Sequence, residues 1–165
     1  LNAVELPEQE FEWGEHCLSE KVHLKLTGFS DLLKTNIIET LSEIIDVRYA
    51  YSLNEVWKNT YHRYYHQESH SHPNSELSFV IFMNDYQEND AKFYFLNERN
   101  RVTSTTWLSL SEGMEDSIYV EPKKGDILFF PSHMIHGVTP HQSDIPRITI
   151  SGNISLKNLG EENPN

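Results

Sequence analysis

The fold is decided by the stretch Gly125-Asp-Ile-Leu-Phe-Phe-Pro131-Ser-His-Met-Ile-His136-Gly-Val138. Its apolar run predicts a short strand that ends near Pro131, and His136 stands a few residues beyond it. The pattern Arg147-Ile-Thr-Ile predicts the next strand and begins eleven residues after His136. A histidine and an arginine on neighbouring strands are what a metal site with an adjacent anion-binding site requires. The stretch therefore indicates a metalloenzyme built on a β-barrel.

A metal needs further ligands, and the other dense supply is His70-Ser-His72-Pro-Asn-Ser-Glu76. Side chains i and i+2 of a strand point to one face, so His70 and His72 can enter the same cavity. Together with His136 they offer imidazole nitrogens, which suit iron, zinc, copper and nickel. Glu76 is an alternative ligand if it begins the next strand pointing inward, because it would complete a face of two histidines and one carboxylate.

The remaining histidines have weaker grounds for a site role. His133 lies beside His136 in the same predicted loop. The others have no partner at ligand spacing, and we expect them to be polar surface residues: His16, His23, His62, His66 and His141.

Arg147 lies in the pattern Arg-Ile-Thr-Ile-Ser, where Ile148 and Ile150 alternate with Arg147, Thr149 and Ser151. If the isoleucine face is the packed outer one, Arg147 points into the barrel, where an unpaired guanidinium is costly. It then requires a carboxylate, and a bidentate clamp helped by a nearby hydroxyl suits a dicarboxylate such as 2-oxoglutarate. The alternative is a surface ion pair with one of the 25 acidic residues.

Clusters of β-branched and aromatic residues dominate the rest of the chain, separated by turn-forming residues. Short strands without intervening helices predict an antiparallel sandwich or barrel. A helix is expected at 30–47, where Leu33, Ile37, Leu41 and Ile44 form one apolar stripe, and it should pack on the outside. The predicted strands lie at 56–65, 77–83, 92–96, 103–110, 118–120, 126–130 and 147–154.

A length of 165 residues fits a single domain, with one or two strands and a supporting helix at 1–50 and the β core at 51–157. No apolar run approaches the roughly 20 residues that cross a bilayer, and no signal segment opens the sequence. The lone Cys17 cannot form an internal disulfide, which fits a reducing compartment. We expect a cytoplasmic protein with no membrane partner.

The formal net charge is −12. Such a charge repels a phosphate backbone, and no basic stripe compensates for it. Nucleic acid is therefore not expected as a partner, whereas a positively charged substrate or a basic protein is compatible with this charge.

From about Trp57 to Ser155 the chain resembles the superfamily of 2-oxoglutarate and Fe(II)-dependent oxygenases. In that superfamily a His-x-Asp or His-x-Glu motif, a distal His and an Arg beyond it lie on a double-stranded β-helix. His136 and Arg147 match the distal half. The resemblance implies a mainly β fold, a jelly-roll, cupin-like barrel with one or more N-terminal helices packed outside.

The proximal half resembles a less-characterised group of the superfamily, found in phages and marine bacteria. Its members read Trp-x-Asn, then His-x-His-Pro, then a Ser-Gly-Val-Tyr-Tyr strand, and Trp57-Lys-Asn59, His70-Ser-His72-Pro73 and Ser78-Phe-Val-Ile-Phe82 stand at matching positions. This chain departs from the group at Phe79 and Tyr64, where Gly is typical. His72 stands where the superfamily has its carboxylate. If a phage encodes the protein, its place is the host cytoplasm.

The resemblance implies Fe(II) as cofactor, 2-oxoglutarate as co-substrate and O2 as oxidant. The implied reaction hydroxylates a protein side chain or a small molecule and releases succinate and CO2. The residues implied to act in it are His70, His72 and His136 on the metal, with Glu76 as the alternative acid, and Arg147, Thr149, and Tyr61 or Asn59 on 2-oxoglutarate.

Two other interpretations fit many of the same residues. The spacing of His70, His72, Glu76 and His136 also resembles the two metal-binding motifs of the cupins, which share the barrel but have no general need for an inward Arg147. A metal-binding barrel without catalytic activity is the third interpretation, since a fold does not dictate a function.

Overall fold

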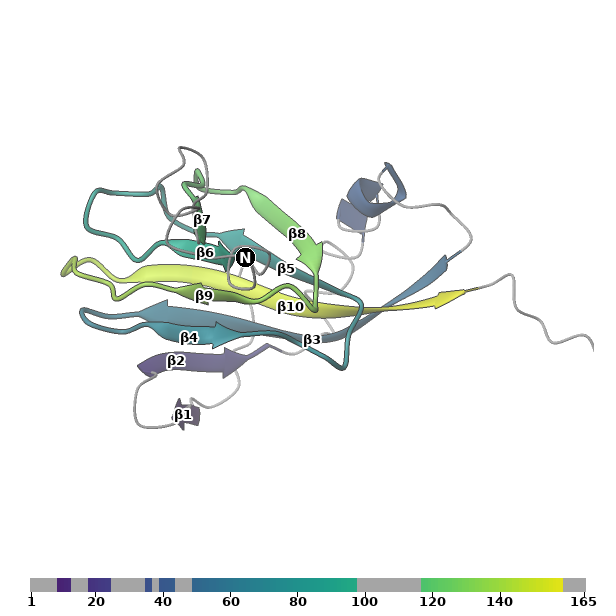
Figure 1. Cartoon of the computed structure of the whole chain (residues 1–165), viewed down its shortest axis with the longest axis horizontal. Coiled ribbons are helices and arrows are strands. Elements are labelled where there is room, and N and C mark those ends of the chain that lie inside the picture. Colours follow the sequence, from purple (N-terminus) through teal and green to yellow (C-terminus); the bar gives the residue numbers. More distant parts are fainter. Residues whose placement is uncertain are drawn as a thin grey trace, which may run out of the picture.

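The computed structural model describes residues 9–12, 18–24, 35–36, 39–43, 49–97 and 117–158, and its described strands form two antiparallel sheets (Figure 1). The larger sheet has the strand order β1 (Gln9–Glu12), β2 (Leu18–His23), β3 (Tyr49–Tyr61), β10 (Arg147–Asn158), β5 (Leu77–Phe82) and β8 (Ile127–Pro131). The smaller sheet has the order β4 (Gln67–His70), β9 (His136–Val138), β6 (Phe93–Leu96) and β7 (Ser117–Val120).

Most strands lie where the apolar clusters predict them. β3 begins earlier than expected, at Tyr49, and runs beside almost the whole of β10. β4 and β9 are strands that the sequence analysis did not delimit, and they bring His70 and His136 into register. The strand predicted at 103–110 lies outside the described residues.

The larger sheet is buried on both faces. Its inner face packs against the smaller sheet through a cluster of Tyr61, Val80, Phe82, Ala91, Phe93, Phe95, Phe130 and Val138. Its outer face carries a second cluster of Leu24, Leu41, Val56, Phe79, Ile150 and Ile154. Side chains therefore alternate between the two faces along β10, as predicted. Ile150 lies on the outer face, while Arg147 and Thr149 line a pocket on the inner face.

The described helical residues are 35–36 and 39–43, inside the range predicted for the helix. Leu41 is buried and belongs to the outer cluster, so this segment covers the outer face of the larger sheet. The remainder of the predicted range lies outside the described residues.

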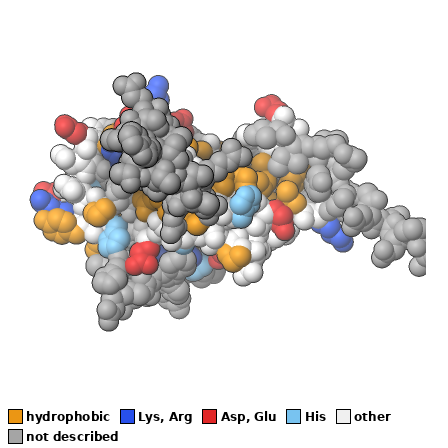
Figure 2. All heavy atoms as spheres, in the orientation of Figure 1, with side chains coloured by type: hydrophobic (Ala, Val, Ile, Leu, Met, Phe, Trp, Pro, Cys, Tyr) orange, Lys and Arg blue, Asp and Glu red, His pale blue; other side chains and the backbone are white. Residues whose placement is uncertain are grey.

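Charged residues of both signs are found among the exposed residues that the structure describes. On the face drawn in Figure 2, the described basic side chains stand singly among acidic, apolar and histidine side chains. Among the residues that the structure describes, no helix is long and apolar enough to cross a membrane.

Candidate metal centre

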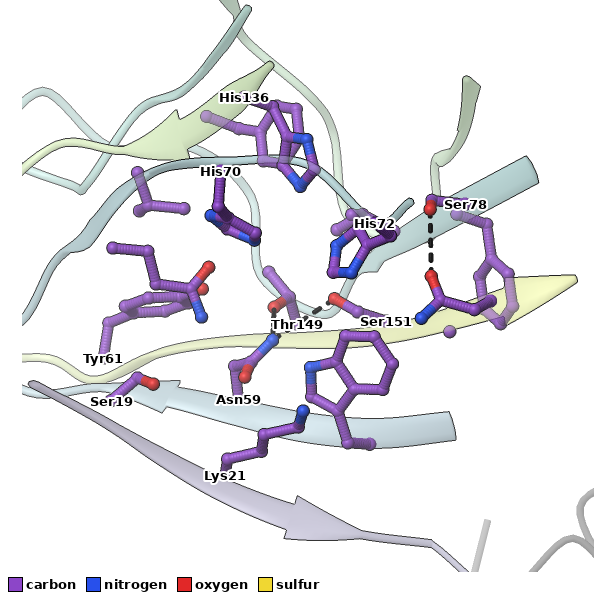
Figure 3. A pocket seen from close by; sticks show the side chains of 18 of the residues that line it. Ser19, Lys21, Asn59, Tyr61, His70, His72, Ser78, His136, Thr149 and Ser151 are labelled. Carbon is purple, nitrogen blue, oxygen red and sulfur yellow. Dashed lines mark hydrogen bonds between the residues drawn. The ribbon is translucent and has the colours of Figure 1, made fainter. Parts of the chain in front are cut away.

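Three histidines converge in the pocket between the two sheets. One ligand atom from each of His70, His72 and His136 lies within 4.8 Å of the others, and all three point into the same space (Figure 3). His70 ends β4 and pairs in register with His136, the first residue of β9. His72 lies in the loop after β4, where its backbone N–H donates to the carbonyl of Ser132 at 2.8 Å.

Backbone carbonyls set the tautomers of two of these rings. Nδ1 of His70 lies 2.7 Å from the carbonyl oxygen of Glu68, and Nδ1 of His136 lies 2.9 Å from that of Met134. A carbonyl can only accept, so each Nδ1 carries the proton and each Nε2 keeps its lone pair. This is the orientation that a metal-binding imidazole needs.

Burial keeps the three rings neutral at physiological pH. It lowers the pKa of His136 to about 3, helped by the neighbouring His70 and His72. Burial likewise lowers the pKa of His72 to about 4, with smaller contributions from His70 and Lys21, and also lowers the pKa of His70. Phe93 stacks on His136 at a centroid distance of 5.4 Å and supplies part of the apolar surroundings.

Glu76 does not join this cluster. Its side chain is exposed, and its Oε2 accepts the backbone N–H of Leu156 at 2.8 Å, which holds the carboxylate away from the pocket. The alternative in which Glu76 replaces His72 as a ligand therefore disagrees with the geometry. His133 is also exposed, in the turn between β8 and β9, and does not line the pocket.

The other histidines divide into two kinds. His23 is exposed, His62 is half-exposed and lies 3.1 Å from Glu20, and His66 is partly exposed, much as expected. The expectation that His141 is a surface residue is wrong, because its side chain is fully buried. His16 lies outside the described residues.

Arg147 supplies a candidate anion site in the same pocket. Its side chain is buried, Nη1 donates to the carbonyl of Ala91, and Nη2 has no hydrogen-bond partner among the described residues. Burial lowers the pKa of Arg147, since charge is costly there. A buried guanidinium with an unpaired N–H group requires an anionic acceptor, and a carboxylate fits.

Asn59, Tyr61 and Thr149, to which the resemblance assigns contacts with 2-oxoglutarate, line this pocket. Asn59 Nδ2 lies 3.2 Å from Ser151 Oγ and 3.4 Å from Thr149 Oγ1, whereas Asn59 Oδ1 has no partner among the described residues. The pocket thus offers a bound ligand the unpartnered Nη2 of Arg147 as a donor and the unpartnered Oδ1 of Asn59 as an acceptor.

Sequence reasoning missed the residues that hold Arg147. His141 Nδ1 accepts the N–H of Ala91 at 3.0 Å, and its Nε2–H donates to the carbonyl of Ile145 at 2.8 Å. Ala91 is thereby fixed with its carbonyl on Arg147. A backbone carbonyl leaves no side-chain pattern in a sequence. His141 has no partner at ligand spacing, so nothing in the sequence indicates that it is buried and supports Ala91.

Two packed antiparallel sheets, three convergent imidazoles and an inward arginine define a β protein with a candidate metal site beside a candidate anion site. Residues 55–153, more than half of the chain, match the family described as "Putative 2OG-Fe(II) oxygenase". The chain therefore belongs to the 2-oxoglutarate- and Fe(II)-dependent oxygenases, with Fe(II) as cofactor and 2-oxoglutarate as co-substrate. No curated protein sequence is significantly similar to it.

Solved oxygenase structures share the fold. A 2OG-Fe(II) oxygenase family oxidoreductase from Burkholderia pseudomallei superposes with a TM-score of 0.67 at 14% identity, covering 93% of this chain and 74% of that one. HygX from Streptomyces hygroscopicus, with nickel, 2-oxoglutarate and hygromycin B bound, gives a TM-score of 0.62 at 12% identity, covering 90% and 73%. The α-ketoglutarate-dependent carbocyclase SnoK of nogalamycin biosynthesis gives 0.66 at 10% identity, covering 90% and 68%.

Proposed function

We propose that this protein is a hydroxylase in which His70, His72 and His136 hold Fe(II) and Arg147 holds the distal carboxylate of 2-oxoglutarate. Thr149 supports that carboxylate, and Tyr61 or Asn59 contacts the co-substrate. The reaction converts R–H, O2 and 2-oxoglutarate into R–OH, succinate and CO2. One oxygen atom of O2 enters succinate and the other enters the product, so 2-oxoglutarate supplies the two electrons that the hydroxylation requires.

The residues fit the metal by their chemistry. Three neutral imidazoles are suitable ligands for Fe(II), and three protein ligands would leave room for the co-substrate and O2. Bound Fe(II) would supply the oxidative chemistry, which imidazole and guanidinium groups lack. The chain's own residues orient the ligands: the carbonyls of Glu68 and Met134 fix two rings, and the apolar wall around Phe93 limits the access of water.

The observation that carries the proposal is the unpartnered Nη2 of Arg147 in the pocket that also holds the histidines. A cupin that does not use 2-oxoglutarate, or a barrel that only binds metal, has no need to bury this cation. Arg147 therefore favours the oxygenase over both alternatives.

We also propose that the chain belongs to the His-x-His-Pro group of phages and marine bacteria. The proposal rests on the sequence from His70 to Pro73 and on the inward position of His72. We further propose that the primary substrate is a protein side chain or a small molecule.

The test is succinate formation from 2-oxoglutarate under 18O2, with purified protein, Fe(II) and ascorbate. We expect Fe(II)-dependent succinate that carries one 18O atom, even without the primary substrate, and its loss in Arg147→Gln. A protein that forms no succinate and does not bind 2-oxoglutarate when loaded with metal would support the cupin alternative instead.

A further inference from the structure

A row of polar side chains crosses the inner face of the larger sheet, beside the candidate metal centre. Asn153 of β10 pairs in register with Glu55 of β3 and with Ser78 of β5, and Ser132 follows the last residue of β8. Asn153 Nδ2 lies 2.9 Å from Glu55 Oε1. Ser78 Oγ lies 2.9 Å from Asn153 Oδ1, a bond that Figure 3 marks with a dashed line, and 2.8 Å from Ser132 Oγ. We call these four residues the polar row; Ser78, Ser132 and Asn153 are buried, and Glu55 is partly exposed.

The direction of each hydrogen bond in the polar row follows from the carboxylate at one end. A carboxylate only accepts, so Asn153 presents its Nδ2 to Glu55 and its Oδ1 to Ser78. An amide oxygen also only accepts, so the hydroxyl hydrogen of Ser78 is donated to Asn153. Ser78 then accepts the hydroxyl hydrogen of Ser132. Both buried hydroxyls therefore have an acceptor, and successive bonds in one direction reinforce one another.

Ser132 connects the polar row to the loop that carries His72. Its carbonyl accepts the backbone N–H of His72 at 2.8 Å, and its own backbone N–H donates to the carbonyl of Glu76 at 3.0 Å. These two bonds fix the loop at His72 and again four residues later. Because the hydroxyl of Ser132 is held by Ser78, the position of this loop depends on the polar row.

His72 needs this support more than the other two histidines. His70 and His136 lie on paired strands, and the carbonyl two residues earlier holds each of their rings. Among the described residues, no carbonyl is hydrogen-bonded to the ring of His72, which lies 6.0 Å from the ring of Trp57. The place of this imidazole is therefore determined mainly by the backbone of its loop, and Ser132 holds that backbone.

We propose that Ser132, Ser78 and Asn153 are positioning residues for His72: the polar row, ending on Glu55, holds the loop so that this imidazole reaches the metal. The inference rests on the proposed function, in which His72 is the third ligand of Fe(II). Ser78 and Asn153 line the pocket, yet their polar atoms bind each other and their neighbours in the row. Residues that orient a metal ligand commonly change metal affinity by about 10–100-fold when they are replaced.

The test measures Ni(II) binding to the purified protein by calorimetry, without 2-oxoglutarate. We expect both Ser78→Ala and Ser132→Ala to bind Ni(II) about tenfold more weakly than the natural protein. Ser78→Ala interrupts the row and leaves Asn153 Oδ1 and the Ser132 hydroxyl without their partner. Ser132→Ala removes only the first donor of the row, so it is the milder variant and serves if Ser78→Ala does not fold.

Ser155→Ala is the matched control. Ser155 Oγ accepts from Asn54 Nδ2 at 2.7 Å, so this variant also removes a serine hydroxyl that binds an asparagine between β3 and β10. Ser155 does not line the pocket. Its replacement should leave the affinity for Ni(II) unchanged.

The same replacements in a His72→Ala background separate positioning from a general loss of structure. If the polar row acts through His72, Ser78→Ala or Ser132→Ala has nothing left to misplace there, and Ni(II) affinity should stay within about twofold of that of His72→Ala alone. A general loosening of the fold would disturb His70 and His136 as well. It would therefore weaken Ni(II) binding in both backgrounds.

The inference is overturned if Ser132→Ala binds Ni(II) as tightly as the natural protein, or if it weakens binding equally with and without His72. Either result, together with weaker binding by His72→Ala itself, refutes this inference alone. A natural protein that does not bind Ni(II), or a His72→Ala variant that binds it equally well, refutes the ligand set of the proposed function too.

Discussion

His70 and His136 face each other across neighbouring antiparallel strands, and each donates its Nδ1–H to the carbonyl two residues earlier in the chain. The same local geometry, repeated on β4 and β9, leaves both Nε2 atoms with their lone pairs for a metal. His72 completes the group from a loop that hydrogen bonds to Ser132, after β8. The two strands thus prepare the site before any metal binds.

Removal of one of these ligands should weaken metal binding. We expect His136→Ala to lower the affinity for Mn(II) or Ni(II) at least tenfold, because two imidazoles hold a divalent ion less well than three. His133→Ala is the matched control, since His133 lies in the turn just before β9 and is exposed. Equal affinities in the two variants, measured by calorimetry, would contradict the assignment of the ligands.

The buried His141 should be important for stability. Replacement by Leu leaves the N–H of Ala91 and the carbonyl of Ile145 without their hydrogen-bond partner, at a cost of about 2–4 kcal/mol in the free energy of unfolding. His62→Leu, at a half-exposed position paired with Glu20, should cost less than about 1 kcal/mol. Urea unfolding of both variants measures the difference, and similar losses would show that the His141 network has no special role.

Tyr64 adopts a backbone conformation that favours glycine. Its φ is 71°, and its side chain is largely exposed. Because a side chain in this region costs roughly 1–2 kcal/mol, Tyr64→Gly should leave the Tm unchanged or raise it, despite the greater freedom of glycine in the unfolded chain. Tyr64→Val should lower the Tm. A clear loss of stability in Tyr64→Gly would mean that the tyrosine side chain matters more than the backbone.

Acid should destabilise the metal-free protein in part through His72. Its pKa is about 4 in the folded chain and near 6.5 in the unfolded one. Below pH 6.5 the unfolded chain therefore binds a proton that the folded chain does not, and the free energy of unfolding falls until about pH 4. The Tm of His72→Gln should consequently fall less steeply between pH 6.5 and 4 than that of the natural protein. Parallel Tm curves would contradict the lowered pKa.

The sequence predicts those parts of the site that depend on periodicity. Alternation along the strand that begins at Arg147 predicts an inward guanidinium, which is found. His70 and His72 also share the predicted cavity, but His72 reaches it from the loop after β4 and not through alternation along a strand. The pairing of His70 with His136 is different, because the register between strands distant in sequence depends on tertiary packing.

The features that sequence reasoning missed also depend on tertiary contacts. The orientation of Glu76 follows from a hydrogen bond to the backbone of β10, and the burial of His141 follows from two backbone partners. Lys21 enters the pocket because β2 pairs with β3, which no local pattern around Lys21 indicates.

The central claim is that metal and 2-oxoglutarate share one site, with Arg147 on the distal carboxylate. An anaerobic titration of the Fe(II)-loaded protein with 2-oxoglutarate, followed by visible absorption, tests it most directly. We predict a charge-transfer band that saturates with 2-oxoglutarate, depends on Fe(II), and requires at least tenfold more 2-oxoglutarate in Arg147→Gln while Fe(II) binding is kept. A metal-loaded protein that shows no band, or an Arg147→Gln variant that titrates like the natural protein, would contradict the account.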